Sequence, residues 1–162
     1  MKKTVTKFLI LSVILGLIPI YKKAQAAPNI TVTGSWSEII DASDLQAGPG
    51  SDLINSYESA SNAISIEITG TGQANWQVNV KKIDTDWPSS FYLYVKRTSD
   101  GIGGGSISRG TFYQEVTETD KDFFEGQANR SDIHLQLKLG GVSVQIPPGT
   151  YTTTVYYTVI GY

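Results

Sequence analysis

The chain has 162 residues, 40% of them hydrophobic, and carries a formal net charge of −2. This length suits one domain with a hydrophobic core. The absence of cysteine excludes a disulfide framework, a thiolate metal site and a cysteine nucleophile.

The first 26 residues have the pattern of a secretory signal peptide. Three lysines at the start are followed by an apolar run from Phe8 to Ile20, too short to span a bilayer, and by the small-residue motif AQA. We expect cleavage after Ala26 and export through the periplasm to the cell surface. The remaining chain has eight basic and 15 acidic residues, a net charge of −7 (8 − 15). This charge argues against nucleic acid as a partner, because such binding relies on neutralised phosphates.

From residue 29 onwards, apolar and polar residues alternate in short runs, as they do in strands with one buried face. In chain order, the positions on the apolar faces are Ile30, Val32, Gly34 and Trp36; Ile64, Ile66 and Ile68; Trp76, Val78 and Val80; Phe91, Leu93 and Val95; Ile133, Leu135, Leu137 and Leu139; Val142, Val144 and Ile146; and Tyr151, Val155, Tyr157 and Val159. A weaker strand is expected from Gly110 to Val116.

Turn-forming sequences separate these runs: AGPGS, GTGQ, DTDWPSS, DGIGGGS, LGG and PPG. About seven or eight short strands with one apolar face each predict an all-β fold, an immunoglobulin-like antiparallel β-sandwich. We expect GIGGGS to form a mobile hairpin tip rather than a domain boundary. No long helix is expected, although Asp52 to Ala63 has the character of a helical turn or two.

Few residues have the pattern of a catalytic or metal site. His134 is the only histidine and lies among polar positions of its strand, so we interpret it as solvent-facing. The acidic stretch from Thr117 to Gly126 has Phe123 where an EF-hand loop needs glycine, and it predicts a solvated loop rather than a calcium site. We therefore predict no enzyme activity, no cofactor and no metal.

The three tryptophans suggest a sugar-stacking platform as an alternative kind of site. Trp36 and Trp76 are in phase with core positions of their strands, which favours burial for both. Trp87 is then the tryptophan that we expect to be exposed.

The two ends of the exported chain are its most informative segments. The final strand is uncharged from Gly149 to Tyr162 and contains no lysine or proline that would protect a sheet edge. Such a strand predicts that something covers it. The segment APNITVTGSW, which follows the expected cleavage site, can fold back on its own domain or extend into the sheet of a neighbour.

These two ends resemble segments of fimbrial subunits of the chaperone–usher class, including the spore-coat-U-like group. In that family, a glycine at the fourteenth position from the C-terminus opens an alternating strand, and Gly149 holds this position in GTYTTTVYYTVIGY. NITVTGSW resembles the donor segment of fimbrial major subunits. The resemblance covers about 14 residues at each end, and the middle matches only in strand character. The chain departs from the family at Gly161, where a tyrosine is usual, and in lacking a disulfide.

The resemblance implies an incomplete sandwich that a donated strand completes. Residues 27–36 would be the donor strand, and residues 37–162 the pilin-like domain. The implied donor positions are Ile30, Val32, Gly34 and Trp36. The implied acceptor groove is formed by Gly149, Tyr151, Val155, Tyr157, Val159 and Tyr162. The implied partners are identical or related subunits, a periplasmic chaperone and an outer-membrane usher.

The leading hypothesis is therefore a structural subunit of a cell-surface pilus that polymerises head-to-tail and supports adhesion or biofilm formation. The alternative is a self-complete secreted β-sandwich, such as an adhesin or a carbohydrate-binding module. That alternative predicts that Ile30 to Trp36 packs within its own chain and that an aromatic residue near Trp87 or Tyr92 and Tyr94 binds a glycan. A small hydrolase is a third alternative, disfavoured by the single histidine and the absence of a nucleophile motif.

Overall fold

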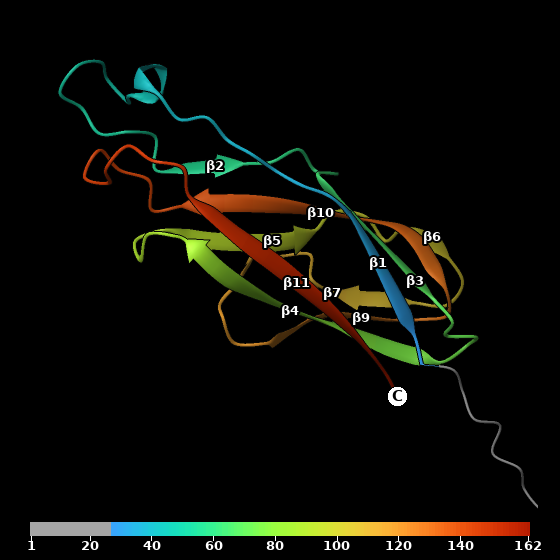
Figure 1. Ribbon diagram of the computed structural model, residues 1–162. Coiled ribbons are helices and arrows are strands. Elements are labelled where there is room, and N and C mark those ends of the chain that lie inside the picture. Colours follow the sequence, from blue (N-terminus) through green and yellow to red (C-terminus); the bar gives the residue numbers. More distant parts are fainter. Residues whose placement is uncertain (1–26) are drawn as a thin grey trace, which may run out of the picture.

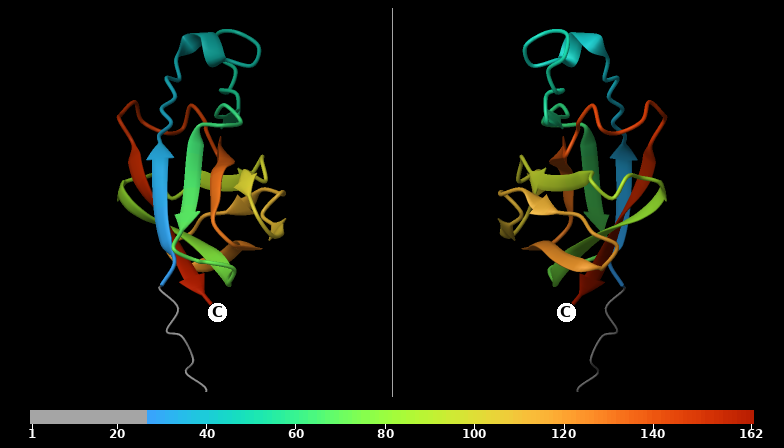
Figure 2. Two further views of the ribbon diagram at one scale, coloured as in Figure 1. Left: turned by 90° about the vertical axis from the view of Figure 1, so that its right-hand side faces the viewer. Right: turned by 90° about the vertical axis from the view of Figure 1, so that its left-hand side faces the viewer.

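A computed structural model describes residues 27–162 and shows two antiparallel β-sheets that pack face to face (Figures 1 and 2). The all-β sandwich expected from the alternation is thus confirmed. The expected signal peptide, residues 1–26, lies outside the described residues. Within residues 27–162, no helix is long and apolar enough to cross a membrane.

The first sheet has the strand order β1-β3-β10-β5-β8, and two short strands, β2 and β6, also pair with β10. Its strands are β1 (Asn29–Gly34), β2 (Ser56–Glu58), β3 (Ile64–Thr69), β5 (Tyr92–Arg97), β6 (Ile102–Gly103), β8 (Gln114–Glu115) and β10 (Arg130–Gly140). The edge strand β1 pairs with β3 through six consecutive residue pairs, from Asn29 opposite Thr69 to Gly34 opposite Ile64.

The second sheet has the strand order β11-β4-β9-β7. Its strands are β4 (Asn75–Asp86), β7 (Ile107–Arg109), β9 (Lys121–Gln127) and β11 (Thr152–Gly161). A single turn of 3₁₀ helix, η1 (Ala42–Asp44), lies in the long loop between β1 and β2, which projects from one end of the sandwich (Figure 2).

The core forms where the inward positions of the two sheets meet, as the alternation predicts. The apolar side chains buried there include Ile64, Ile66, Ile68, Trp76, Val78, Val80, Leu93, Val95, Ile133, Leu135 and Leu137. Trp76 is fully buried, and its indole nitrogen donates a hydrogen bond to the Ala128 carbonyl at 2.7 Å.

The acidic stretch is not a solvated loop, and the expectation from the sequence is wrong there. Most of it forms β9, and both Phe123 and Phe124 are buried in the core. The pairing of β9 with β4 shifts by one residue, from Val78 opposite Phe124 to Asn79 opposite Asp122. Because this bulge places two consecutive side chains on the buried face, the simple alternation of a strand is lost.

Two further boundaries differ from the sequence predictions. Residues 142–146 form a turn rather than a strand, with the Ile146 N–H donating to the Ser143 carbonyl at 3.1 Å. Gly141 has φ +81°, and a Cβ there would lie 1.9 Å from the Ser90 carbonyl oxygen, so the chain leaves the sheet at this glycine. Conversely, β4 continues through the first three residues of the expected turn DTDWPSS, to Asp86.

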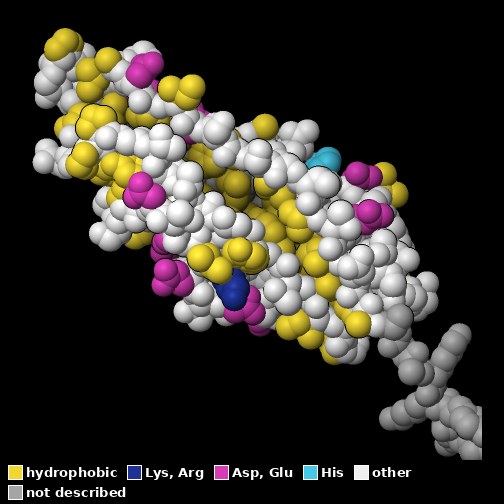
Figure 3. All heavy atoms as spheres, in the orientation of Figure 1, with side chains coloured by type: hydrophobic (Ala, Val, Ile, Leu, Met, Phe, Trp, Pro, Cys, Tyr) yellow, Lys and Arg dark blue, Asp and Glu magenta, His cyan; other side chains and the backbone are white. Residues whose placement is uncertain are grey.

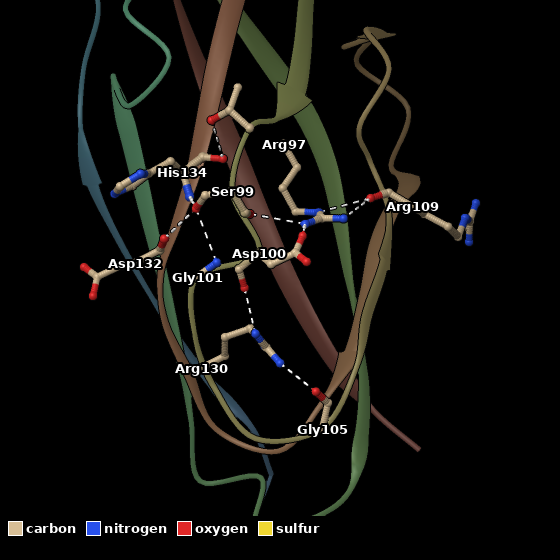
Figure 4. Close-up of polar contacts among 10 residues, drawn as sticks. Arg97, Ser99, Asp100, Gly101, Gly105, Arg109, Arg130, Asp132 and His134 are labelled. Atoms are coloured by element: carbon tan, nitrogen blue, oxygen red, sulfur yellow. Dashed lines mark hydrogen bonds and ion pairs between the residues drawn. The ribbon is translucent and has the colours of Figure 1, made fainter.

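The glycine-rich segment GIGGGS crosses from one sheet to the other instead of forming a hairpin tip. Its first part belongs to β6, which pairs with β10, and β7 follows directly and pairs with β9. Two buried arginines hold this crossing (Figure 4). Arg130 donates to the carbonyls of Asp100, Gly104 and Gly105 at 2.8–3.0 Å. Arg97 donates to the carbonyls of Ser99 and Arg109 and forms an ion pair with Asp100. We call this the closed side of the sandwich.

Candidate functional site

The opposite side of the sandwich is open, and there the edge strands of the two sheets lie next to each other. β1 ends the first sheet and β11 ends the second, and they run in opposite directions (Figures 1 and 2). They approach most closely where β1 starts and β11 ends, since a Cβ on Gly161 would lie 2.9 Å from Pro28 Cδ. In the described part of the chain, neither strand pairs with anything on its outer edge. We call the strip between β1 and β11 the seam.

β11 supplies the inner wall of the seam. Its inward side chains Val155, Tyr157 and Val159 are only half-buried, although they pack against the core. On the outward face, Tyr156 and Ile160 are 45% and 46% exposed. Figure 3 shows a run of hydrophobic side chains between the two edge strands. A long, uncharged strand with a free edge of this kind is a template for pairing with another strand.

The hydroxyl group of Tyr157 is the least satisfied polar group of the seam. It is buried and has no hydrogen-bond partner among residues 27–162. Burial raises the pKa of Tyr157 far above its ordinary value. A buried hydroxyl without a partner costs about 1–3 kcal/mol, so this group destabilises the open side.

β1 supplies the other wall. Ile30 is half-buried against the core, whereas Val32 is 40% exposed. Gly34 closes the strand with φ +103°, and a Cβ there would lie 2.1 Å from the Ala63 carbonyl oxygen. Trp36 follows the strand, packs half-buried against the core, and donates from Nε1 to Glu38 Oε2 at 3.2 Å. β1 therefore packs within its own chain, as the self-complete alternative predicts.

The other expected groove residues lie at the two ends of β11. Gly149 is exposed and precedes the strand, so it does not line the seam. Tyr151 is half-buried, stacks edge-on against Phe91 with ring centroids 5.5 Å apart, and donates its hydroxyl to the Pro147 carbonyl. Tyr162 is 66% exposed, and its N–H donates to the Asn75 carbonyl at 3.1 Å.

A pocket of about 340 Å³ lies at the end of the seam where β1 starts. It is lined by Ala27, Pro28, Thr71, Ala74, Asn75, Val159, Gly161 and Tyr162. Two of these residues, Thr71 and Ala74, come from the turn between β3 and β4, which the sequence predicts only as a turn. The positive φ angles of Gly70 and Gly72 shape that turn, and GTGQ was the signal for it.

The residues considered for chemistry lie away from the seam. The His134 backbone N–H donates to Ser99 Oγ, which in turn donates to the Asp132 carbonyl. The Ser99 hydroxyl is therefore bonded to two backbone groups of β10. In the described residues, no group of three or more His, Cys, Asp or Glu side chains could hold a metal ion. Trp87 is not the exposed tryptophan expected from the sequence, because it packs half-buried against the core and Phe91.

Compared with protein-family models, with curated proteins and with solved structures, the chain matches none of them.

Proposed function

We propose that this protein is a structural subunit of a cell-surface fibre, in which each subunit donates β1 to the seam of the next. The observation that carries the proposal is the free edge of β11, which is long, uncharged and flanked by half-buried apolar side chains. In this role the protein is exported and contributes to adhesion or biofilm formation. Its partners are copies of itself or related subunits, with a chaperone and an usher that guide assembly.

Donation requires β1 to leave its own β3. With cleavage after Ala26, as the sequence predicts, the exported chain starts two residues before β1, so β1 is the segment that can be donated. Once β1 has left, both β3 and β11 have free edges, and an incoming β1 can lie between them. Ile30 then meets the same core face that it meets within one chain, and the partly exposed Val32 lies on the same face of β1.

The gain from exchange lies on the β11 side. Within one chain β1 is hydrogen-bonded to β3 alone, while the β11 edge has no partner in the described residues. Each backbone hydrogen bond added there contributes about 0.5–1.5 kcal/mol net. Addition of one subunit to the next in the same sense is a heterologous contact, which generates open filaments rather than closed rings.

The experiment is gel electrophoresis of the exported protein with and without boiling. A ladder that collapses to one band on boiling supports non-covalent strand exchange. Val32→Lys places a charge among the apolar positions of β1 and should abolish the ladder. Thr31→Lys on the outward face is the matched control and should preserve it. If deletion of residues 27–36 leaves the ladder intact, the proposal is wrong.

The second candidate is a self-complete secreted sandwich, such as an adhesin or a carbohydrate-binding module. The pairing of β1 with β3 of its own chain through six residue pairs favours it. This candidate predicts one monomer band with or without boiling, from protein that is folded and soluble without a chaperone.

A further inference from the structure

A second hollow lies on the outer face of the first sheet, away from the seam. It has a volume of about 210 Å³ and is lined by Thr31 and Thr33 of β1, Ser65 and Glu67 of β3, and Ser131 and Asp132 of β10. The strand alternation explains this set, because the apolar neighbours of these residues point into the core. Thr31 lies opposite Glu67, and Thr33 opposite Ser65. We call this hollow the outer pocket.

An irregularity in β10 directs Asp132 towards the outer pocket. The pairing of β10 with β3 shifts between Arg130 and Ile133, and Asp132 has φ +55°, which few residues other than glycine adopt. The Asp132 carbonyl accepts a hydrogen bond from Ser99 Oγ at 2.8 Å, which ties this bulge to the closed side. In Figure 4 the side chains of Asp132 and His134 point to the same side, away from the guanidinium groups of Arg97 and Arg130. Bulges of this kind re-aim side chains next to functional sites.

The lining is made entirely of oxygen-bearing side chains. Glu67 and Asp132 form no ion pair in the described part of the chain. Among the described residues, two hydrogen bonds involve these side chains: Ser131 Oγ donates to Asp132 Oδ2 at 3.2 Å, and Thr33 Oγ1 donates to the Ser65 carbonyl at 3.5 Å. Two carboxylates and four hydroxyl groups therefore offer acceptors to a ligand that brings several donors.

The chemistry of the lining narrows the class of ligand. Two carboxylates repel an anion, and no apolar side chain is available to hold a hydrophobic molecule. The described residues contain no group of three His, Cys, Asp or Glu side chains able to hold a metal ion. A neutral sugar, whose several hydroxyl groups both donate and accept hydrogen bonds, matches the carboxylate and hydroxyl oxygens of this lining.

We propose that the outer pocket binds one residue of a neutral glycan. The Glu67 and Asp132 carboxylates accept hydrogen bonds from sugar hydroxyl groups, and the threonine and serine hydroxyls complete the contacts. Because Thr31 and Thr33 belong to β1, the site exists whenever a β1 strand lies against β3. That strand can come from the same chain or from a second copy, so this proposal does not rest on fibre formation.

The test is saturation-transfer difference NMR of the full exported chain with methyl glycosides of mannose, galactose, glucose and N-acetylglucosamine. This method observes the ligand, so it works on monomer and fibre alike. We expect at least one glycoside to bind with a Kd in the millimolar range, about 4 kcal/mol of binding free energy. Glu67→Gln and Asp132→Asn should each weaken binding at least about tenfold. Asparagine tolerates a positive φ, so the second variant keeps the bulge.

Glu115→Gln is the matched control, because Glu115 is an exposed carboxylate on another strand of the same sheet and does not line the pocket. Its affinity should equal that of the parent protein. The proposal is overturned if no glycoside gives a signal, or if the Glu67 and Asp132 variants bind as the parent does. Saturable binding of Ca²⁺ that depends on both carboxylates, without sugar binding, would also overturn it. None of these outcomes bears on the electrophoretic test of fibre formation.

Discussion

The two sides of the sandwich are closed in different ways. On the closed side the chain crosses between the sheets, and Arg97 and Arg130 donate to carbonyls of the crossing segment (Figure 4). On the open side β1 and β11 lie together without pairing, and the buried Tyr157 hydroxyl has no partner in the described part of the chain. The difference teaches that the chain itself joins the two sheets on the closed side, whereas the open side still offers a free strand edge.

The largest effect is expected from breaking the closed side. Arg130→Met removes the donors for three carbonyls, those of Asp100, Gly104 and Gly105. The three carbonyls belong to exposed residues, so the expected loss is that of the hydrogen bonds themselves, about 0.5–1.5 kcal/mol each, and the free energy of unfolding should fall by about 2–4 kcal/mol in urea denaturation. Arg109→Met is the control, since the exposed Arg109 side chain points away from the network (Figure 4). This control should change stability by less than about 0.5 kcal/mol. Equal stability of the two variants would show that the arginine network is not what closes this side.

The closed side also marks the limit of what the sequence predicts. The alternation identified β3, β10 and β11, because each buries one regular face. It missed β9, because the bulge opposite Val78 and Asn79 buries Phe123 and Phe124 together. It also gave no sign that two arginines would be buried, because their partners are carbonyls of a distant segment and carry no side-chain signature.

For the open side, the sequence predicted the inward face of β11 and the apolar positions of β1. It left open whether β1 stays within its own chain. The proximity of β1 to β11 depends on how the two sheets stack, so alternation along each strand could not predict it. The outer pocket likewise needs three strands in register before Thr31, Glu67 and Asp132 come together.

A smaller effect is expected from loosening the open side at Gly34. Alanine at this position has to adopt φ +103° with its Cβ 2.1 Å from the Ala63 carbonyl oxygen. We expect a loss of about 2–3 kcal/mol, with faster amide hydrogen exchange in β1. If the seam accepts a second copy's β1, the released strand should also raise the yield of heat-sensitive ladder.

Gly48→Ala is the control that separates the cost of a positive φ from the cost of the steric contact expected in Gly34→Ala. Gly48 has φ +87°, but nothing lies within 4 Å of a Cβ built there. This variant therefore reports the cost of a positive φ alone, about 1 kcal/mol. Equal losses for the two alanine variants would mean that the contact with Ala63 does not hold β1 in place.

The smallest effect, and one of opposite sign, is expected at Tyr157. Tyr157→Phe removes a buried hydroxyl without a partner, so it should stabilise the protein by about 1–2 kcal/mol. Tyr151→Phe is the matched change, and it should destabilise by about 0.5–1.5 kcal/mol because the Tyr151 hydroxyl donates to the Pro147 carbonyl. Thermal denaturation of the two variants at neutral pH measures both effects, and a loss of stability in Tyr157→Phe would show that the hydroxyl has a partner.

The pH dependence of the same variant sharpens the test. Burial raises the pKa of Tyr157 in the folded state, whereas a tyrosine in the unfolded chain has a pKa of about 10. Above that pH the unfolded chain releases a proton that the folded chain keeps, so stability falls as pH rises. Tyr157→Phe lacks this contribution and should lose less stability between about pH 9 and pH 11. Burial also raises the pKa of Tyr113, to about 12, so part of the decline should persist in the variant. An identical decline in variant and parent would show that the Tyr157 hydroxyl is exposed to water and not buried on the open side.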